Sequence, residues 1–386
     1  MQYRKFGKLD WRVSALGFGA MRLPVVGNDQ SNVDKPEAIR MIRYAIDHGV
    51  NYLDTGYSYH NGQSERVVGM ALKDGYRERM RLATKMPAML VQKAEDFDRF
   101  FNDQLERLQA GKLDYYLLHG LNARSWPKMR DLGIISWAER KIAEGRFDYL
   151  GFSFHDNYET FRSIIDSYDN WTLCQIQYNY VDVNDQAGRR GVEYAASKNL
   201  AIVVMEPIRG GRLSRKPPDK VAAVWGDALG KRSQAEWALS WVWNQPEISL
   251  ALSGMSTMEQ VVENVAVAEG AEAGMLSPDD MALIDRVREA YKDSSPISCT
   301  GCNYCQPCPS GVAIPRIFEM YNEAVVWGET RQGRANYRGL MPQGLKPEER
   351  ADQCVECGEC EEKCPQKIAI AEWLKKAHAF LGPKPA

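Results

Sequence analysis

The sequence predicts an α/β protein: a (β/α)8 TIM barrel with an N-terminal β-hairpin, followed by a small, mostly α-helical domain. Eight short apolar runs alternate with segments of helical periodicity before residue 290, and eight of the nine cysteines fall after residue 298. Strands that are apolar along their whole length are typical of parallel sheets covered on both faces. A stretch of ~250 residues is also the usual size of a (β/α)8 barrel.

The expected elements follow one another in a regular order. Alternating apolar and polar residues around Gly7 and Lys8 indicate the hairpin. The eight strands are expected in "SALGFGAM", "NYLDTG", "RLATKMP", "DYYLLHG", "YLGFSF", "TLCQIQYN", "LAIVVMEP" and "ISLALSGM". The first helix, in "KPEAIRMIRYAIDHG", places one apolar face at Ala38, Met41, Ile42, Ala45 and Ile46. Further helices are expected at 64–72, 94–108, 132–143, 158–165, 188–196, 233–243 and 258–268.

Length and charge limit the class of protein. The 386 residues exceed the usual size of a single core, so we expect a barrel domain at 1–292 and a second domain at 293–386, joined at "KDSSPIS". A net charge of −2 argues against nucleic acid or an anionic membrane as the main partner. The N-terminus has no apolar signal segment and no run could span a bilayer, so we expect a cytoplasmic protein.

Four polar residues stand at or just after consecutive strand ends, where (β/α)8 barrels carry their chemistry. They are Asp54, Tyr59, Lys85 and His119. An ammonium such as Lys85 lowers the pKa of a nearby phenol, and Asp54 would keep that ammonium charged. Tyr59 could then act as a general acid, while His119 hydrogen-bonds a substrate carbonyl. Each residue alone could be structural, but four matched roles favour carbonyl reduction.

The motifs "LDTGYSYHNGQSE", "LATKMP", "DYYLLHG", "LGFSFHD", "QIQYN", "MEPIRGGRL" and "GMSTMEQVVEN" resemble, in order, those of the aldo-keto reductases. The resemblance covers about residues 1 to 290 and implies that Asp54, Tyr59, Lys85 and His119 form the catalytic tetrad. It also implies a nicotinamide cofactor and a small carbonyl or alcohol substrate. The implied cofactor contacts are Ser153 and Gln175 for the nicotinamide, Pro207, Gly210, Gly211 and Leu213 for the pyrophosphate, and Glu263 and Asn264 for the adenine.

The chain departs from the family pattern at two places. Phe154 stands where many relatives have a second polar residue for the nicotinamide amide, and His155 could compensate. Gly254 and Gln260 stand where NADPH-preferring members often have cations for the 2′-phosphate. NADPH and NADH therefore both remain open. Trp126, Tyr57, Met21 and Trp225 are candidates for the wall of a substrate pocket or for simple loop packing.

Two cysteine runs predict iron-sulfur clusters in the second domain. The second run, "CVECGECEEKCP", has the bacterial ferredoxin spacing, in which three thiolates bind one [4Fe-4S] cluster and the fourth binds the other. In the first run, two residues separate the last two cysteines, Cys305 and Cys308, where the second run has three. Two clusters are expected, one on Cys299, Cys302, Cys305 and Cys364, the other on Cys354, Cys357, Cys360 and Cys308. A single cluster on the second run and structural zinc are the alternatives.

The segment between the cysteine runs favours a helical module. "IPRIFEMYNEAVVWG" places Ile314, Ile317, Phe318, Tyr321 and Val325 at helical spacing. With its long insert, the tail resembles α-helical ferredoxins and the ferredoxin-fused branch of the aldo-keto reductases. Cys174, alone in the barrel, is expected in the core.

Two functions remain open from the sequence. One is an NAD(P)H-dependent oxidoreductase that interconverts a carbonyl and an alcohol, with clusters for structure, redox sensing or exchange with a ferredoxin-type partner. The other is a nicotinamide-binding regulatory protein with little turnover.

Overall fold

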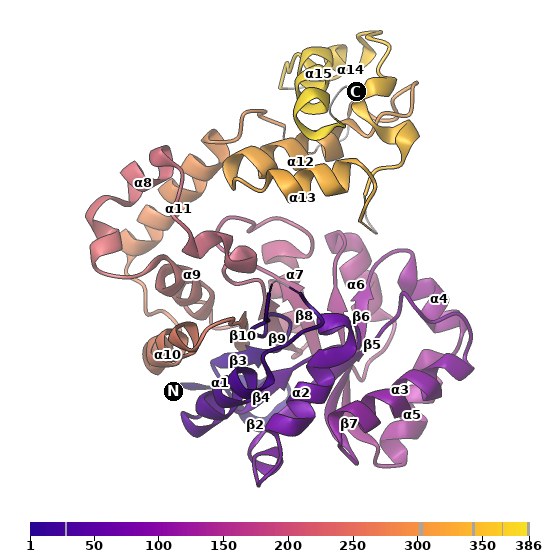
Figure 1. Ribbon diagram of the computed structural model, residues 1–386, viewed down its shortest axis with the longest axis vertical. Coiled ribbons are helices and arrows are strands. Elements are labelled where there is room, and N and C mark those ends of the chain that lie inside the picture. The colour runs from indigo at the N-terminus through magenta and orange to yellow at the C-terminus, as the bar shows by residue number, and fades with distance from the viewer. Residues whose placement is uncertain (28, 300, 302–303, 342–343, 365, 384–386) are drawn as a thin grey trace. The chain divides into compact units, whose positions relative to one another are not determined.

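The computed structural model describes residues 1–27, 29–299, 301, 304–341, 344–364 and 366–383. By its internal contacts the chain divides into one unit of Met1–Arg215 with Leu229–Met281, and another of Lys216–Ala228 with Ala282–Ala386. The first unit contains a closed barrel of parallel strands with helices outside it, and an antiparallel hairpin precedes the barrel (Figure 1). The predicted fold class is confirmed.

The barrel strands join in the order β10-β3-β4-β5-β6-β7-β8-β9. The hairpin consists of β1 (Tyr3–Phe6) and β2 (Leu9–Ser14). The barrel strands are β3 (Leu16–Gly19), β4 (Tyr52–Asp54), β5 (Arg81–Met86), β6 (Leu113–Leu121), β7 (Phe147–Phe154), β8 (Leu173–Gln177), β9 (Ala201–Met205) and β10 (Leu250–Gly254). Each lies within or across one of the eight apolar runs that predict it.

The helices of the first unit lie outside the strands. They are α1 (Lys35–Asp47), α2 (Gln63–Ala71), α3 (Glu95–Leu108), α4 (Ser125–Asp131), α5 (Ile134–Ala143), α6 (Tyr158–Asp166), α7 (Gly188–Ser197), α9 (Gln234–Trp243) and α10 (Met258–Val267). The Asp34 carboxylate caps α1 by accepting a hydrogen bond from the Glu37 amide. The five apolar residues predicted on one face of α1 are all buried.

The hairpin closes the amino end of the barrel and leaves the carboxyl end open. Phe6 and Val13 of the hairpin are buried in one cluster with residues near the starts of the strands, including Tyr52 and Tyr115. The ring centroids of Phe6 and Tyr115 lie 5.1 Å apart. This apolar plug directs any large cavity in the barrel to the carboxyl ends of its strands.

The second unit is helical. Its helices include α8 (Asp219–Trp225), most of α11 (Pro278–Asp293), α12 (Ile314–Val326), α13 (Thr330–Tyr337), α14 (Glu359–Glu362) and α15 (Ile370–Leu381). α12 is the helix predicted between the cysteine runs, and Ile317 and Phe318 enter the core with Leu374 of α15. Val325 is wrongly predicted for that face: it is 40% exposed near the end of α12.

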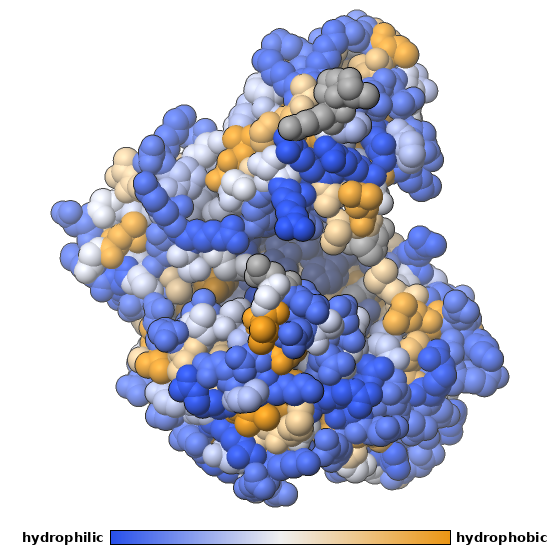
Figure 2. All heavy atoms as spheres, viewed as in Figure 1, coloured by the Kyte–Doolittle hydropathy of each residue, from blue (hydrophilic) through white to orange (hydrophobic). Residues whose placement is uncertain are grey.

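The surface of the first unit carries no broad apolar area on the face seen in Figure 2, where apolar side chains form small groups among hydrophilic ones. Scattered apolar residues of this kind are normal for a globular protein. Among the helices of the described residues, none combines the length and apolarity needed to cross a bilayer.

A close approach of α2 and α3 sets the spacing of the helix layer next to β5. A methyl group on Gly69 of α2 would lie 2.5 Å from the carbonyl oxygen of Leu108. Only a glycine therefore lets the two helices meet at this distance, and both helices carry polar residues that reach the barrel wall behind the site described below.

We expect Gly69→Ala to lower the free energy of unfolding by ~1–3 kcal/mol, because the added methyl group forces the helices apart. Gly111→Ala is the matched control: no heavy atom lies within 4 Å of its added methyl group, so its change should stay within about 0.5 kcal/mol. Urea unfolding of the two variants measures both values. Equal stabilities would contradict the close approach.

Candidate active site, cofactor groove and cysteine centre

One large cavity of about 780 Å³ opens at the carboxyl ends of the barrel strands. It brings together nearly all residues that the sequence predicts for catalysis and cofactor binding. Its wall includes Asp54, Tyr59, Lys85, His119, Ser153, Gln175, Pro207, Gly210, Gly211, Glu263 and Asn264. Leu213 is the exception, since its side chain is fully buried and does not line the cavity.

A buried ion pair forms the floor of the cavity. The Lys85 ammonium donates to Asp54 Oδ1 at 2.5 Å, to the Thr55 carbonyl at 2.7 Å and to the Tyr59 hydroxyl at 3.3 Å. Burial opposes the charge on Lys85, but Asp54 and Tyr59 outweigh it, so the pKa of Lys85 is raised. Lys85 is therefore an ammonium at neutral pH and can support negative charge on the Tyr59 oxygen.

The pKa of Tyr59 lies above its usual value because the phenol is buried. Lys85 acts in the opposite direction, as the sequence predicts, and Asp54 adds to the increase. The expectation of a lowered pKa thus omits burial, which is the larger effect. A raised pKa keeps the hydroxyl protonated at neutral pH, and a protonated phenol is what a general acid requires.

His119 is a neutral imidazole beside Tyr59. Burial lowers its pKa to about 3, with further contributions from Lys85 and His155. Its ring centroid lies 5.7 Å from that of Tyr59, in an edge-to-face arrangement. A neutral ring retains one N–H and can donate it to an oxygen placed between the two side chains.

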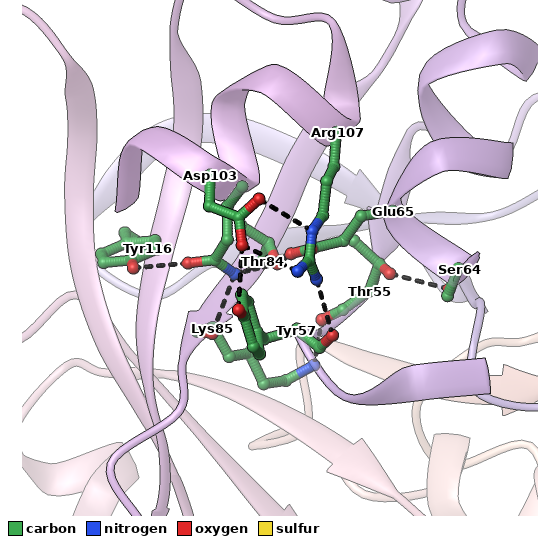
Figure 3. A network of polar contacts seen from close by, with 10 residues as sticks. Thr55, Tyr57, Ser64, Glu65, Thr84, Lys85, Asp103, Arg107 and Tyr116 are labelled. Atoms are coloured by element: carbon green, nitrogen blue, oxygen red, sulfur yellow. Dashed lines mark hydrogen bonds and ion pairs between the residues drawn. The ribbon is translucent and has the colours of Figure 1, made fainter. Parts of the chain in front are cut away.

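A polar network holds Lys85 from the helix side of β5, and the sequence analysis does not predict it (Figure 3). Gln104 of α3 donates to the Lys85 carbonyl at 3.0 Å, to Thr84 at 3.0 Å and to Glu65 at 2.7 Å. Tyr116 donates to the Gln104 carbonyl at 2.6 Å. Charged and amide residues on the buried faces of α2 and α3 are the sequence signal that could have revealed this network.

The loop that carries Tyr59 is fixed by an unusual backbone and by its neighbour His60. His60 and Asn61 have positive φ angles of 51° and 53°. The His60 ring accepts a hydrogen bond from the Leu23 amide at 3.0 Å and donates to the Gln30 carbonyl at 3.0 Å. His60 thereby joins the loop after β3 to the loop after β4, and both border the cavity.

The predicted nicotinamide end of the cavity offers a free amide oxygen. Gln175 Oε1 is buried and has no hydrogen-bond partner among the described residues, while Ser153 accepts from the Gly120 amide at 2.8 Å. A carboxamide NH₂ placed here would supply the missing donor. Phe154 packs on Phe161 in the core, and His155 lines the cavity in its place.

The predicted adenine end is formed by residues past the middle of α10. Asn264 donates to Ser253 at 3.0 Å, and Glu263 accepts from the Ser233 hydroxyl at 2.5 Å.

Of the candidates for the pocket wall, Met21 lines the cavity. Tyr57 instead donates its hydroxyl to Asp103, and Trp126 packs against Trp171; neither lines the cavity.

A second, smaller cavity in the helical unit is lined by cysteines of both runs. They are Cys305, Cys308, Cys354, Cys357 and Cys360. Burial raises the pKa of Cys360 to about 11, with contributions from Cys354, Glu361 and Cys308. Cys299 packs against the core of the unit, Cys364 is buried within it, and Cys302 lies outside the described residues. Cys174 is buried on β8.

The cysteine cavity fits the donor set expected for an iron-sulfur cluster, because Cys308 of the first run faces the same space as three thiols of the second. In the part of the chain that the structure describes, no three Cys, His, Asp or Glu side chains converge closely enough to surround a single metal ion.

The barrel, its cavity and the cysteine module define an NAD(P)H-dependent oxidoreductase with an iron-sulfur domain, and comparisons with known proteins support this class. Residues 15–289 match the aldo/keto reductase family, so the chain belongs to that family. Residues 298–369 match the 4Fe-4S dicluster domain.

Relatives resemble the barrel at low identity. L-galactose dehydrogenase of Arabidopsis thaliana is 25% identical over 312 residues, covering 76% of this chain and 96% of its own. The holo form of aldo-keto reductase AKR11C1 from Bacillus halodurans is 26% identical with a TM-score of 0.62, covering 74% and 96%. An aldo-keto reductase from Klebsiella pneumoniae in complex with NADPH is 25% identical with a TM-score of 0.59, covering 75% and 96%.

The neutral state of His119 predicts a pH dependence of stability. Below pH ~6.5 a histidine in the unfolded chain binds a proton that folded His119 does not bind until about pH 3. The free energy of unfolding should therefore fall as the pH falls from 7 to 5. In His119→Asn this fall should be smaller. Urea unfolding of both proteins at each pH measures the slopes, and equal slopes would contradict a neutral His119.

Proposed function

We propose that the barrel interconverts a small-molecule aldehyde or ketone and the corresponding alcohol. The observation that carries this proposal is the contact between the Lys85 ammonium and the Tyr59 hydroxyl at 3.3 Å, beside a neutral His119, at the floor of one cavity. Bound NAD(P)H supplies the hydride. Every other part of the step falls to side chains of this chain.

Each side chain has one role in the proposed reduction. Tyr59 donates its proton to the oxygen of the substrate as charge develops there. The Lys85 ammonium stabilises the resulting phenolate, and Asp54 keeps Lys85 charged and in place. The N–H of neutral His119 orients the substrate oxygen and stabilises its charge. In the reverse direction, the Tyr59 phenolate accepts the proton of the alcohol.

The residues along the cavity support the placement of the nicotinamide cofactor. Ser153 and the unpartnered Gln175 oxygen would hold the carboxamide near Tyr59. Pro207, Gly210 and Gly211 would lie along the pyrophosphate, and Glu263 and Asn264 by the adenine. We assign no contact to Leu213, because its side chain is in the core.

Tyr59→Phe should lower kcat/KM for carbonyl reduction by about 100-fold or more, because the general acid is lost. NADPH binding should stay nearly unchanged, since the ring still fills its place. Tyr76→Phe is a matched control that removes a hydroxyl bonded to Asp47 away from the cavity. Nicotinamide absorbance follows turnover, and fluorescence titration follows binding. Full turnover in Tyr59→Phe would overturn the assignment of Tyr59.

We also propose that the second domain, taken as residues 293–386, holds two [4Fe-4S] clusters. Cys354, Cys357 and Cys360 would bind one cluster together with Cys308; all four line one cavity, which Cys305 of the other set also lines. Cys299, Cys302, Cys305 and Cys364 would bind the other. The clusters pass single electrons, so a ferredoxin-type protein is the partner that suits them, while the hydride step proceeds without them.

Anaerobic analysis should find about eight iron and eight sulfide per chain. Two double variants test the ligand sets. Cys308→Ala with Cys357→Ala should retain about four iron, because both thiols belong to one cluster. Cys305→Ala with Cys308→Ala should retain far less, because each belongs to a different cluster. The opposite order would contradict crosswise ligation, and zinc without sulfide would contradict clusters altogether.

A further inference from the structure

Arg22 lies in the loop after β3, and its side chain crosses the two segments predicted to hold the cofactor. A methyl group on Gly254, at the end of β10, would lie 3.2 to 3.3 Å from Cβ, Cγ and Cδ of Arg22. A methyl group on Gly210, in the loop after β9, would lie 2.9 Å from Nη2 of its guanidinium. The arginine stem thus rests on Gly254, and its charged end lies over Gly210.

Both neighbouring loops fix the backbone of this residue. The Ser256 hydroxyl donates to the Arg22 carbonyl at 2.9 Å, and the Ser256 amide donates to Gln260 at 2.8 Å. On the other side, the Leu23 amide donates to His60. The loop after β3 is therefore tied both to the start of α10 and to the loop of Tyr59, while the Arg22 side chain lines the cavity.

The Arg22 guanidinium is available for an anion. Within the described ranges, no carboxylate lies within 4.0 Å of it. Another arginine near the cavity, Arg209, does have a carboxylate partner, Asp182, at 2.7 Å. The Glu263 carboxylate, which also lines the cavity, accepts a hydrogen bond from Ser233. An arginine on a cavity wall without a carboxylate partner suits a phosphate, which accepts two N–H bonds of the planar guanidinium.

We propose that Arg22 binds the pyrophosphate of the nicotinamide cofactor. This inference rests on the function proposed above. The guanidinium lies over Gly210, in the segment predicted for the pyrophosphate, while only the stem of Arg22 contacts Gly254, one of the two positions where NADPH-preferring relatives often have cations for the 2′-phosphate. Arg22 therefore supplies a charged contact that NADH and NADPH share. A side chain on Gly210 or Gly254 would occupy the space of the arginine, which explains why both positions are glycine.

Titration of the full-length protein with four ligands tests the proposal. NADH, NADPH and ADP-ribose contain the pyrophosphate, whereas adenosine 2′-monophosphate contains only the other phosphate. Arg22→Met should lower the affinity for NADH, NADPH and ADP-ribose by the same factor, about 10- to 100-fold. Its affinity for adenosine 2′-monophosphate should be unchanged. Arg22→Lys should restore part of the affinity, because it retains the charge but not the planar pair of donors.

Two controls separate this contact from a change in fold. Arg162→Met removes an equal charge from an exposed arginine of α6 that pairs with Asp166, and it should bind all four ligands as the wild type does. In Arg22→Met, KM for the cofactor should rise while kcat at saturation stays near that of the wild type. Added salt should weaken the wild type more than Arg22→Met.

The outcomes separate the two proposals. Unchanged affinities in Arg22→Met would overturn the role of Arg22 alone. Weaker binding of only NADPH and adenosine 2′-monophosphate would overturn the pyrophosphate assignment and place the contact at the 2′-phosphate. Failure of the wild-type protein to bind either dinucleotide would overturn the proposed function of the barrel, and this inference with it.

Discussion

The candidate active site depends on one buried ion pair, between Lys85 on β5 and Asp54 on β4. Both side chains are almost fully buried, with exposed fractions of 1% and 2%. An ammonium in such a place is costly unless it is paired and hydrogen-bonded, and loss of one partner leaves an uncompensated charge. The pair therefore requires β4 and β5 to keep their register, in which Asp54 lies opposite Ala83. The same ammonium adds to the lowering of the His119 pKa by burial and opposes part of the rise in the Tyr59 pKa.

The alternation of side chains along β5 connects this ion pair to the helix layer. Lys85 points into the cavity, and Thr84 points to the helices, as neighbours on a strand do. Thr84 donates to Glu65 at 2.7 Å, and Gln104 bonds both of them as well as the Lys85 carbonyl. Burial raises the pKa of Glu65, although hydrogen bonds from Thr84 and Gln104 and the charge of Arg107 lower it. The position of Lys85 is thus fixed from the cavity side and from the helix side.

The residues at strand ends could be predicted from the sequence. The apolar runs locate the strands, and (β/α)8 barrels carry their catalytic residues at the carboxyl ends of those strands. The sequence alone did not reveal the network of Glu65 and Gln104: the polar residues on the helix faces are a signal, but which helix faces meet depends on the close approach at Gly69. Nor could it show that the side chains of Leu213, Tyr57 and Trp126 lie outside the cavity wall, because loop side chains follow local packing. The position of Arg22 could not be predicted either, because its contact with Gly210 joins segments almost two hundred residues apart in the sequence.

The protonation of Tyr59 governs the direction in which the proposed site works. Reduction consumes a protonated phenol, and oxidation of an alcohol consumes a phenolate. Burial raises the pKa of Tyr59, and Lys85 opposes part of that rise. At neutral pH the hydroxyl is therefore mostly protonated, which favours reduction, while oxidation should gain as the pH rises. A metal is not needed in either proton transfer. The proposed clusters of the cysteine domain would thus add one-electron chemistry to a barrel whose own residues suffice for the proton of the proposed hydride step.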